Sequence, residues 1–176
     1  PSGGTATVLG ESISHPEKYL PYVGAMIEGP AFYPALSGRE NLKVLAELGG
    51  FPLSRVDQLL EKVDLADRGG SKFKTYSLGM KQRLGIASVL LGDPEVLILD
   101  EPTAVLTPIE ADALFRTLRA MTTEGRTVIF ISHKLDEVMA VSDRITVLRG
   151  GRTVGTVDTS STNKRDLASM MVGRNV

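Results

Sequence analysis

The most constraining feature of the sequence is a pair of short apolar runs, at residues 95–99 and 127–131, with a helical pattern between them. Continuous apolar runs of this length are typical of strands that are buried on both faces of a parallel sheet. Between the runs, Thr107 and Pro108 begin a helix and Gly125 ends it. This alternation of buried strands with helices predicts a three-layer α/β core.

Residues 31–92 have a different texture. Ser37 and Glu40 have the spacing of a capping box that opens a helix. Apolar residues three and four apart predict a second helix over residues 54–63, and we expect a third over residues 78–91. The stretch is therefore interpreted as a helical insertion into the α/β core.

The remaining segments complete the expected architecture. We predict strands at residues 5–9 and 22–27, a hairpin over residues 145–157 with a two-glycine turn, and a last helix over residues 163–172. The chain then divides into a first core segment (1–30), a helical subdomain (31–92), a second core segment (93–158) and a C-terminal helix (159–176).

Composition excludes several classes of protein. With 42% apolar residues the chain can form a packed core, and no cysteine is present for a disulfide or a cysteine-based metal site. A net charge of −1 argues against nucleic-acid binding through a basic surface, so no nucleic-acid partner is expected. The longest aliphatic run, residues 96–99, is far shorter than a membrane span.

The strongest chemical signal is Asp100-Glu101, which follows directly on the apolar run. Ligands of open α/β sheets bind outside the carboxyl ends of the strands, where these two carboxylates are expected. One of them can hold Mg²⁺, and the other can polarise a water molecule. The alternative is that two acids simply begin a surface loop.

Two further signals are weaker when each is taken alone. Ser77 and Gly79 open a helix whose free N–H groups suit a phosphate, although an ordinary helix cap would have the same sequence. His133 follows the second apolar run, where it can donate a hydrogen bond to a phosphate oxygen. A packed or capping histidine is the alternative interpretation.

These signals occur in a fixed order, with 23 residues from Ser77 to Asp100 and 33 from Asp100 to His133. In that order and spacing, the chain resembles the ABC ATPase family over nearly its whole length. Residues 76–83 are similar to the signature motif of the family, residues 97–102 to its Walker B segment, and His133 to its switch histidine. The resemblance implies a P-loop NTPase core of the RecA-like type, here incomplete, with an inserted α-helical subdomain.

The resemblance implies a role for each matching residue, with ATP and Mg²⁺ as the ligands. Asp100 would help to hold Mg²⁺, Glu101 would polarise the attacking water, and His133 would contact the γ-phosphate. Ser77 and Gly79 would contact the ATP of a second nucleotide-binding domain, because sites in this family are shared across a head-to-tail dimer.

Some positions depart from the common family pattern. Leu78 and Met80 replace a glycine and a glutamine of the signature motif, and Thr107 stands where the D-loop has an aspartate. Glu28 stands where the Q-loop has a glutamine, so its contact with nucleotide and Mg²⁺ would add a negative charge. No Gly-x-x-x-x-Gly-Lys-Ser/Thr segment, the Walker A loop that cradles the phosphates, occurs in the sequence. We expect that loop upstream of Pro1, and the chain by itself to be inactive.

The expected function is that of an ATPase subunit at the cytoplasmic face of a membrane, working with transmembrane permease subunits. Residues 27–34 resemble drug and bacteriocin exporters, whereas residues 100–108, 131–138 and 171–174 resemble sugar and nucleoside importers. Two alternatives remain open. One is a soluble ABC ATPase outside transport, and the other is an inactive domain that only binds partners.

Overall fold

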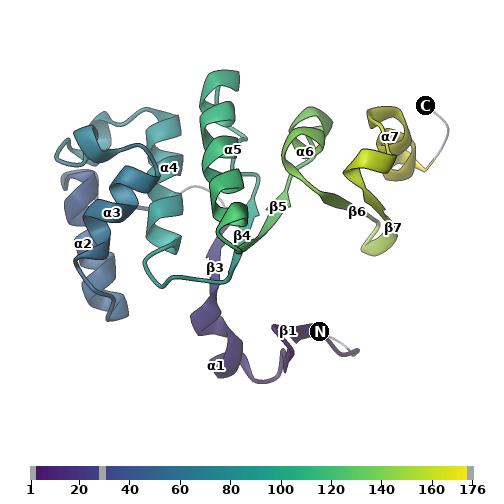
Figure 1. The fold of residues 1–176 in the computed structure, drawn as a ribbon, viewed down its shortest axis with the longest axis horizontal. Helices are drawn as coiled ribbons and strands as arrows, with labels where there is room; N and C mark the ends of the chain where they lie inside the picture. The colour runs from purple at the N-terminus through teal and green to yellow at the C-terminus, as the bar shows by residue number, and fades with distance from the viewer. Residues whose placement is uncertain (1–2, 28–30, 174–176) are drawn as a thin grey trace. The chain divides into compact units, whose positions relative to one another are not determined.

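The computed structural model describes residues 3–27 and 31–173. The chain forms two compact units, Pro1–Ile129 and Phe130–Val176, and each is described by itself. Strands and helices alternate along both units, so the predicted α/β class is confirmed (Figure 1). In the described parts of the chain, no helix combines the length and the apolar character needed to cross a membrane.

The core of the first unit is a sheet in the order β3-β4-β5. Strand β3 (Val23–Met26) pairs in parallel with β4 (Val96–Asp100), with Val23 opposite Val96 and Met26 opposite Leu99. Parallel strands need a long crossover connection. Here that connection holds the whole helical region, which leaves the sheet after β3 and returns to it at β4 (Figure 1).

The helical region consists of α2 (Gly38–Gly49), α3 (Arg55–Lys62) and α4 (Leu78–Val89), with short 3₁₀ turns at Ala66–Arg68 and Phe73–Thr75. The three helices pack on one another, and α4 also packs on β3 (Figure 1). The capping box predicted for Ser37 and Glu40 is present. The centre of the region is aliphatic, and its fully buried side chains include Leu42, Leu60, Leu84 and Leu90.

Helix α5 (Pro108–Thr123) follows β4 and begins as its sequence predicts. Thr107 is the N-cap, Pro108 occupies the first turn, and Glu110 completes a capping box. The predicted apolar face is buried, because Leu114, Leu118 and Met121 are each at most 1% exposed. Local sequence and core packing therefore agree along this helix.

Two expectations about strands are wrong. The strand expected at residues 5–9 is reduced to β1 (Thr7–Val8), which pairs antiparallel with β2 (Glu11–Ser12). Leu9 and Gly10 connect them with φ angles of 52° and 83°, as in a tight hairpin turn. Short helices α1 (Pro16–Tyr19) and η1 (Leu20–Tyr22) then lead into β3. This hairpin is separate from the core sheet.

The second error concerns β5 (Thr127–Ile131), which is expected to be buried on both faces. Instead, Ile129 is 46% exposed and Ile131 is 47% exposed. Exposed and partly buried residues alternate along β5, so among the described residues one face of this strand is left uncovered. Successive side chains of a strand point to opposite faces, and an apolar run does not specify what covers each face.

The second unit contains α6 (Leu135–Val141), β6 (Arg144–Arg149), β7 (Arg152–Asp158), a 3₁₀ turn at Thr159–Ser161 and α7 (Lys164–Val172). The predicted hairpin is the antiparallel pair β6-β7, with Gly150 and Gly151 at positive φ in its turn. Its core is a small apolar cluster of Val138, Ile145, Val147 and Leu167.

One carboxylate joins the helical region to the sheet of the first unit. Asp93, before β4, accepts hydrogen bonds at Oδ1 from Arg55 of α3 (2.9 Å) and from Arg126 (2.6 Å), which precedes β5. These two hydrogen bonds, Arg55 first, hold the pKa of Asp93 at about 2, below its ordinary 3.8. Arg126 also donates to Glu124, which pairs with Lys62 of α3.

We expect Asp93→Asn to lower the free energy of unfolding at pH 7, because a neutral amide attracts the two guanidinium groups less. Since the folded pKa lies below 3.8, this stabilisation is complete above pH 3.8 and disappears as the pH falls through about 2. Urea unfolding of both proteins from pH 7 to pH 2 measures the difference. If the difference in the free energy of unfolding between the two proteins stays constant with pH, this account is wrong. Asp112→Asn is the control, because Asp112 lies on the exposed surface of α5.

Candidate functional site

The two predicted acids lie at the carboxyl end of β4. Asp100 is the last residue of the strand, and Glu101 follows it in the left-handed region, with φ of 44°. A residue other than glycine is uncommon there, and such strain is found at functional sites. The chain turns sharply at this point, since the Ala104 N–H donates to the Glu101 carbonyl at 3.0 Å. Both side chains are only partly exposed.

A buried glutamine of α4 holds this turn. Gln82 is 5% exposed, and its Nε2 donates to the carbonyl of Pro102 at 2.9 Å. Thr103, the next residue, is fully buried. Sequence reasoning did not single out Gln82, although a glutamine four residues before buried Ile86 lies on the apolar side of the helix and is a signal of a buried polar contact.

Ser77 and Gly79 lie at the N-terminus of α4, as predicted. Ser77 is the N-cap, and its Oγ accepts a hydrogen bond from the Met80 N–H at 3.2 Å. The same hydroxyl donates to Oε1 of Glu110 at 3.2 Å. The first turn of α4 therefore meets the first turn of α5, and Glu110 is a further residue of the site that the motifs did not reveal.

The environment of Glu110 favours its ionised form. Hydrogen bonds from the Thr107 backbone and then from its side chain lower the pKa of Glu110, and contacts with Ser77 and the Gly79 N–H lower it further. Burial acts in the opposite direction but does not outweigh them. A carboxylate is thus held between two helix N-termini, where the helix dipoles favour negative charge.

His133 and Glu28 are placed differently. His133 is exposed in the second unit, on the connection between β5 and α6. Glu28 lies outside the described residues. The structure therefore brings Ser77 and Gly79 together with Glu110, and it places Asp100 beside Glu101. The roles expected for these residues, and those of His133 and Glu28, stay predictions.

The acids fit a magnesium site of the kind that phosphates complete. Among residues 3–27 and 31–173, no three histidine, cysteine or acidic side chains are grouped as a metal site. Mg²⁺ is commonly held by one or two carboxylates together with substrate phosphates and water. The partly exposed Asp100, at the open end of a strand, is suited to be one such carboxylate ligand.

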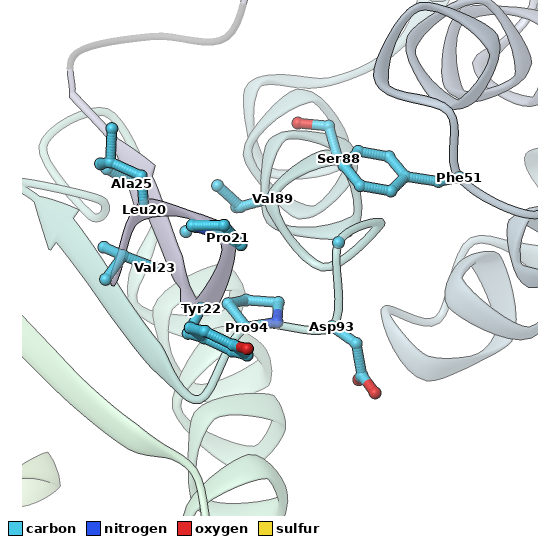
Figure 2. A pocket seen from close by; sticks show the side chains of 12 residues that line it. Leu20, Pro21, Tyr22, Val23, Ala25, Phe51, Ser88, Val89, Asp93 and Pro94 are labelled. Atoms are coloured by element: carbon cyan, nitrogen blue, oxygen red, sulfur yellow. The ribbon is translucent and has the colours of Figure 1, made fainter. Parts of the chain in front are cut away.

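A cleft of about 630 Å³ opens at the opposite end of the strands. It lies beside Val23, which begins β3, and Pro94, two residues before β4, and Phe51 and Val89 extend it toward the helical region (Figure 2). Neither Asp100 nor Glu101 lines this cleft, so the cleft is separate from their site. Nucleotide sites of open α/β sheets lie at the carboxyl ends of the strands, which is the end where the two acids are found.

Comparisons with known proteins agree with the motifs. The family profile described as "ABC transporter" matches residues 1–104. A glucose import ATP-binding protein of Haloferax volcanii is 50% identical over 142 residues, covering 81% of this chain and 25% of that protein. The bacitracin transport ATP-binding protein BcrA of Enterococcus faecalis is 42% identical over 169 residues, covering 94% of this chain and 55% of that protein.

A solved structure supports the fold. An ATP-binding subunit of an ABC transporter matches with a TM-score of 0.74 and 25% identity, over 92% of this chain and 69% of that chain. The curated relatives are longer, since the chain spans from about a quarter to about half of their length. Family profile, relatives and fold agree that this chain belongs to the ATP-binding proteins of the ABC transporter family, with the α/β core of P-loop NTPases and an inserted helical region.

Proposed function

We propose that the chain is the core of an ATPase that couples ATP hydrolysis to the transport of a solute across a membrane. The observation that carries this proposal is the pair of carboxylates at the end of β4, with Glu101 in a strained turn. The names of the relatives support it, since one imports glucose and another transports bacitracin.

In this proposal the two acids have separate tasks. Asp100 would help to hold Mg²⁺, and Glu101 would polarise the water that attacks the γ-phosphate. A bound Mg²⁺ would supply positive charge against the phosphates, while the Glu101 turn fixes the carboxylate beside the strand end. His133 contacts the γ-phosphate, and Glu28 contacts nucleotide and metal.

A second nucleotide-binding domain is the proposed partner of the α4 N-terminus. Ser77 and Gly79 contact the ATP that this second domain holds. Apolar side chains nearby support such an interface, because Leu78 is 53% exposed, Val105 is 54% exposed and Ile109 is 81% exposed. Leu78 and Ile109 are the neighbours of Ser77 and Glu110, which are hydrogen-bonded to each other. Exposed apolar groups of this kind mark interaction surfaces.

The membrane partner is a set of transmembrane permease subunits, with the ATPase at the cytoplasmic face. We assign residues 1–30 and 93–158 to the ATPase core, residues 31–92 to the helical subdomain, and residues 159–176 to a C-terminal helix. The helical subdomain supplies the surface that touches the permease. ATP closes the dimer, and hydrolysis reopens it.

This chain by itself is expected to bind Mg-ATP weakly, because its sequence contains no Gly-x-x-x-x-Gly-Lys segment to supply the phosphate nest. Isothermal calorimetry with Mg-ATP measures the affinity. A dissociation constant in the low micromolar range would show that another part of the chain replaces the loop.

The catalytic proposal is tested in a loop-bearing protein, defined as this sequence preceded by a strand, a Gly-x-x-x-x-Gly-Lys-Ser segment and the helix that such a loop opens. There, Glu101→Gln should reduce ATP turnover by about 10²- to 10⁴-fold, the usual contribution of a residue that moves a proton or orients water. ATP affinity should change little, because the amide keeps the shape of the side chain. Steady-state hydrolysis and size exclusion with ATP measure the two properties.

Asp100→Asn is the matched comparison, since it should weaken the dependence of ATP hydrolysis on Mg²⁺ concentration. If Glu101→Gln hydrolyses ATP within about threefold of the parent rate, well short of a general-base effect, Glu101 does not have the proposed role.

The contact of Gln82 gives an independent prediction. Gln82→Leu leaves the Pro102 carbonyl without its donor, which typically costs about 1–3 kcal/mol for a buried acceptor. Unfolding in urea should show this loss, and kcat of the loop-bearing protein should fall while KM stays unchanged. Ser88→Ala on the same helix is the control, because the Ser88 hydroxyl donates to the Gly85 carbonyl within α4 itself. An unchanged kcat would mean that Gln82 does not position the Glu101 turn.

A further inference from the structure

The N-terminus of α4 already holds an anion that belongs to the chain itself. Oε1 of Glu110 accepts the hydrogen bond from the Ser77 hydroxyl at 3.2 Å. The Gly79 N–H interacts with the same carboxylate. In the proposed function, the Ser77 hydroxyl and the Gly79 N–H bind the phosphate of the ATP that a second domain holds.

The contact depends on the missing side chain of Gly79. A Cβ atom built there would lie 2.4 Å from Oε1 of Glu110 and 2.5 Å from its Cδ. Even an alanine at position 79 would therefore displace the carboxylate. Gly79 is buried, although Ser77 and Leu78 beside it are exposed. The absence of a side chain at Gly79, which would let a phosphate approach the helix, thus lets the Glu110 carboxylate approach it.

Glu110 also has a second attachment. Its Oε2 accepts hydrogen bonds from the Thr107 N–H (3.1 Å) and the Thr107 hydroxyl (3.0 Å) at the start of α5. Oε2 therefore accepts hydrogen bonds at the start of α5, and Oε1 accepts the hydrogen bond at the start of α4. Oε1 can leave Ser77 while the capping box of α5 stays intact.

We propose that Glu110 is an internal competitor for phosphate, which must leave Ser77 and Gly79 before ATP held by a second domain can bind there. This inference rests on the proposed function, because it assigns a regulator to the same helix end. Two anions cannot occupy one helix N-terminus, since each needs the same N–H and O–H donors. Glu110 thereby raises the ATP concentration at which the dimer closes.

The test uses the loop-bearing protein with Glu101→Gln, in which hydrolysis is suppressed. The ATP concentration for half-maximal dimer, measured by light scattering, is compared with and without Glu110→Gln. The amide keeps the length of the side chain and an acceptor for Thr107, but it loses the charge. We expect the required ATP concentration to fall about three- to tenfold, which corresponds to about 0.7–1.4 kcal/mol and lies within the effect of a charge at a partly buried helix N-terminus.

Two matched variants separate the contact from other effects. Glu40→Gln alters the equivalent capping box of α2, where Ser37 N–H donates to Glu40 Oε2 at 2.7 Å, and leaves α4 untouched. Asp112→Asn removes one negative charge from the exposed side of α5 itself. Both should leave the half-maximal ATP concentration within about twofold, as expected for surface charges. An equal shift in either variant, or none with Glu110→Gln, overturns the proposal.

Ser77→Ala distinguishes failure of this inference from failure of the proposed function. If ATP drives no dimer, or if Ser77→Ala leaves the dimer unchanged, the phosphate does not bind at α4, and both proposals are wrong. If Ser77→Ala weakens the dimer but Glu110→Gln does not strengthen it, the proposed function stands and the competition is excluded.

Discussion

The parallel pairing of β3 with β4 is the constraint on which the rest of the first unit depends. It aligns Val23–Met26 with Val96–Leu99 and so joins two segments that the whole helical region separates in sequence. The carboxyl ends of both strands consequently face the same edge of the sheet. Asp100 and Glu101 emerge there, and α4 returns close enough for Gln82 to reach the Pro102 carbonyl. The register of β3 and β4 therefore determines the geometry of the candidate site.

Much of the local structure could be predicted because its determinants are neighbours in sequence. Thr107 and Glu110 specify the start of α5, and Ser37 and Glu40 specify that of α2. The exposure of Ile129 could not be predicted, since an apolar run does not specify what covers each face of its strand. Nor could the separation of the first hairpin from the core sheet, which depends on pairing between strands rather than on the β propensity of residues 5–9.

The candidate site shows the same division. Motif order placed Ser77, Gly79 and the two acids, because the spacing of those residues is itself the signal. Glu110 was visible only as a capping residue, since its contact with Ser77 spans 33 positions and depends on how α4 packs on α5. Gln82 was hidden for a similar reason. Local patterns assign a residue to a helix end or face, and tertiary packing decides which distant group it meets.

The left-handed backbone at Glu101 has a consequence for how this position can vary. A φ of 44° suits glycine, and an L-residue in that region is less stable by roughly 1–2 kcal/mol. The backbone conformation alone would therefore favour glycine or asparagine at position 101. The catalytic role that we propose for the Glu101 carboxylate would oppose that replacement. Under the proposed function, a protein library sorted for thermal resistance would enrich glycine or asparagine there, whereas one sorted for turnover would retain glutamate.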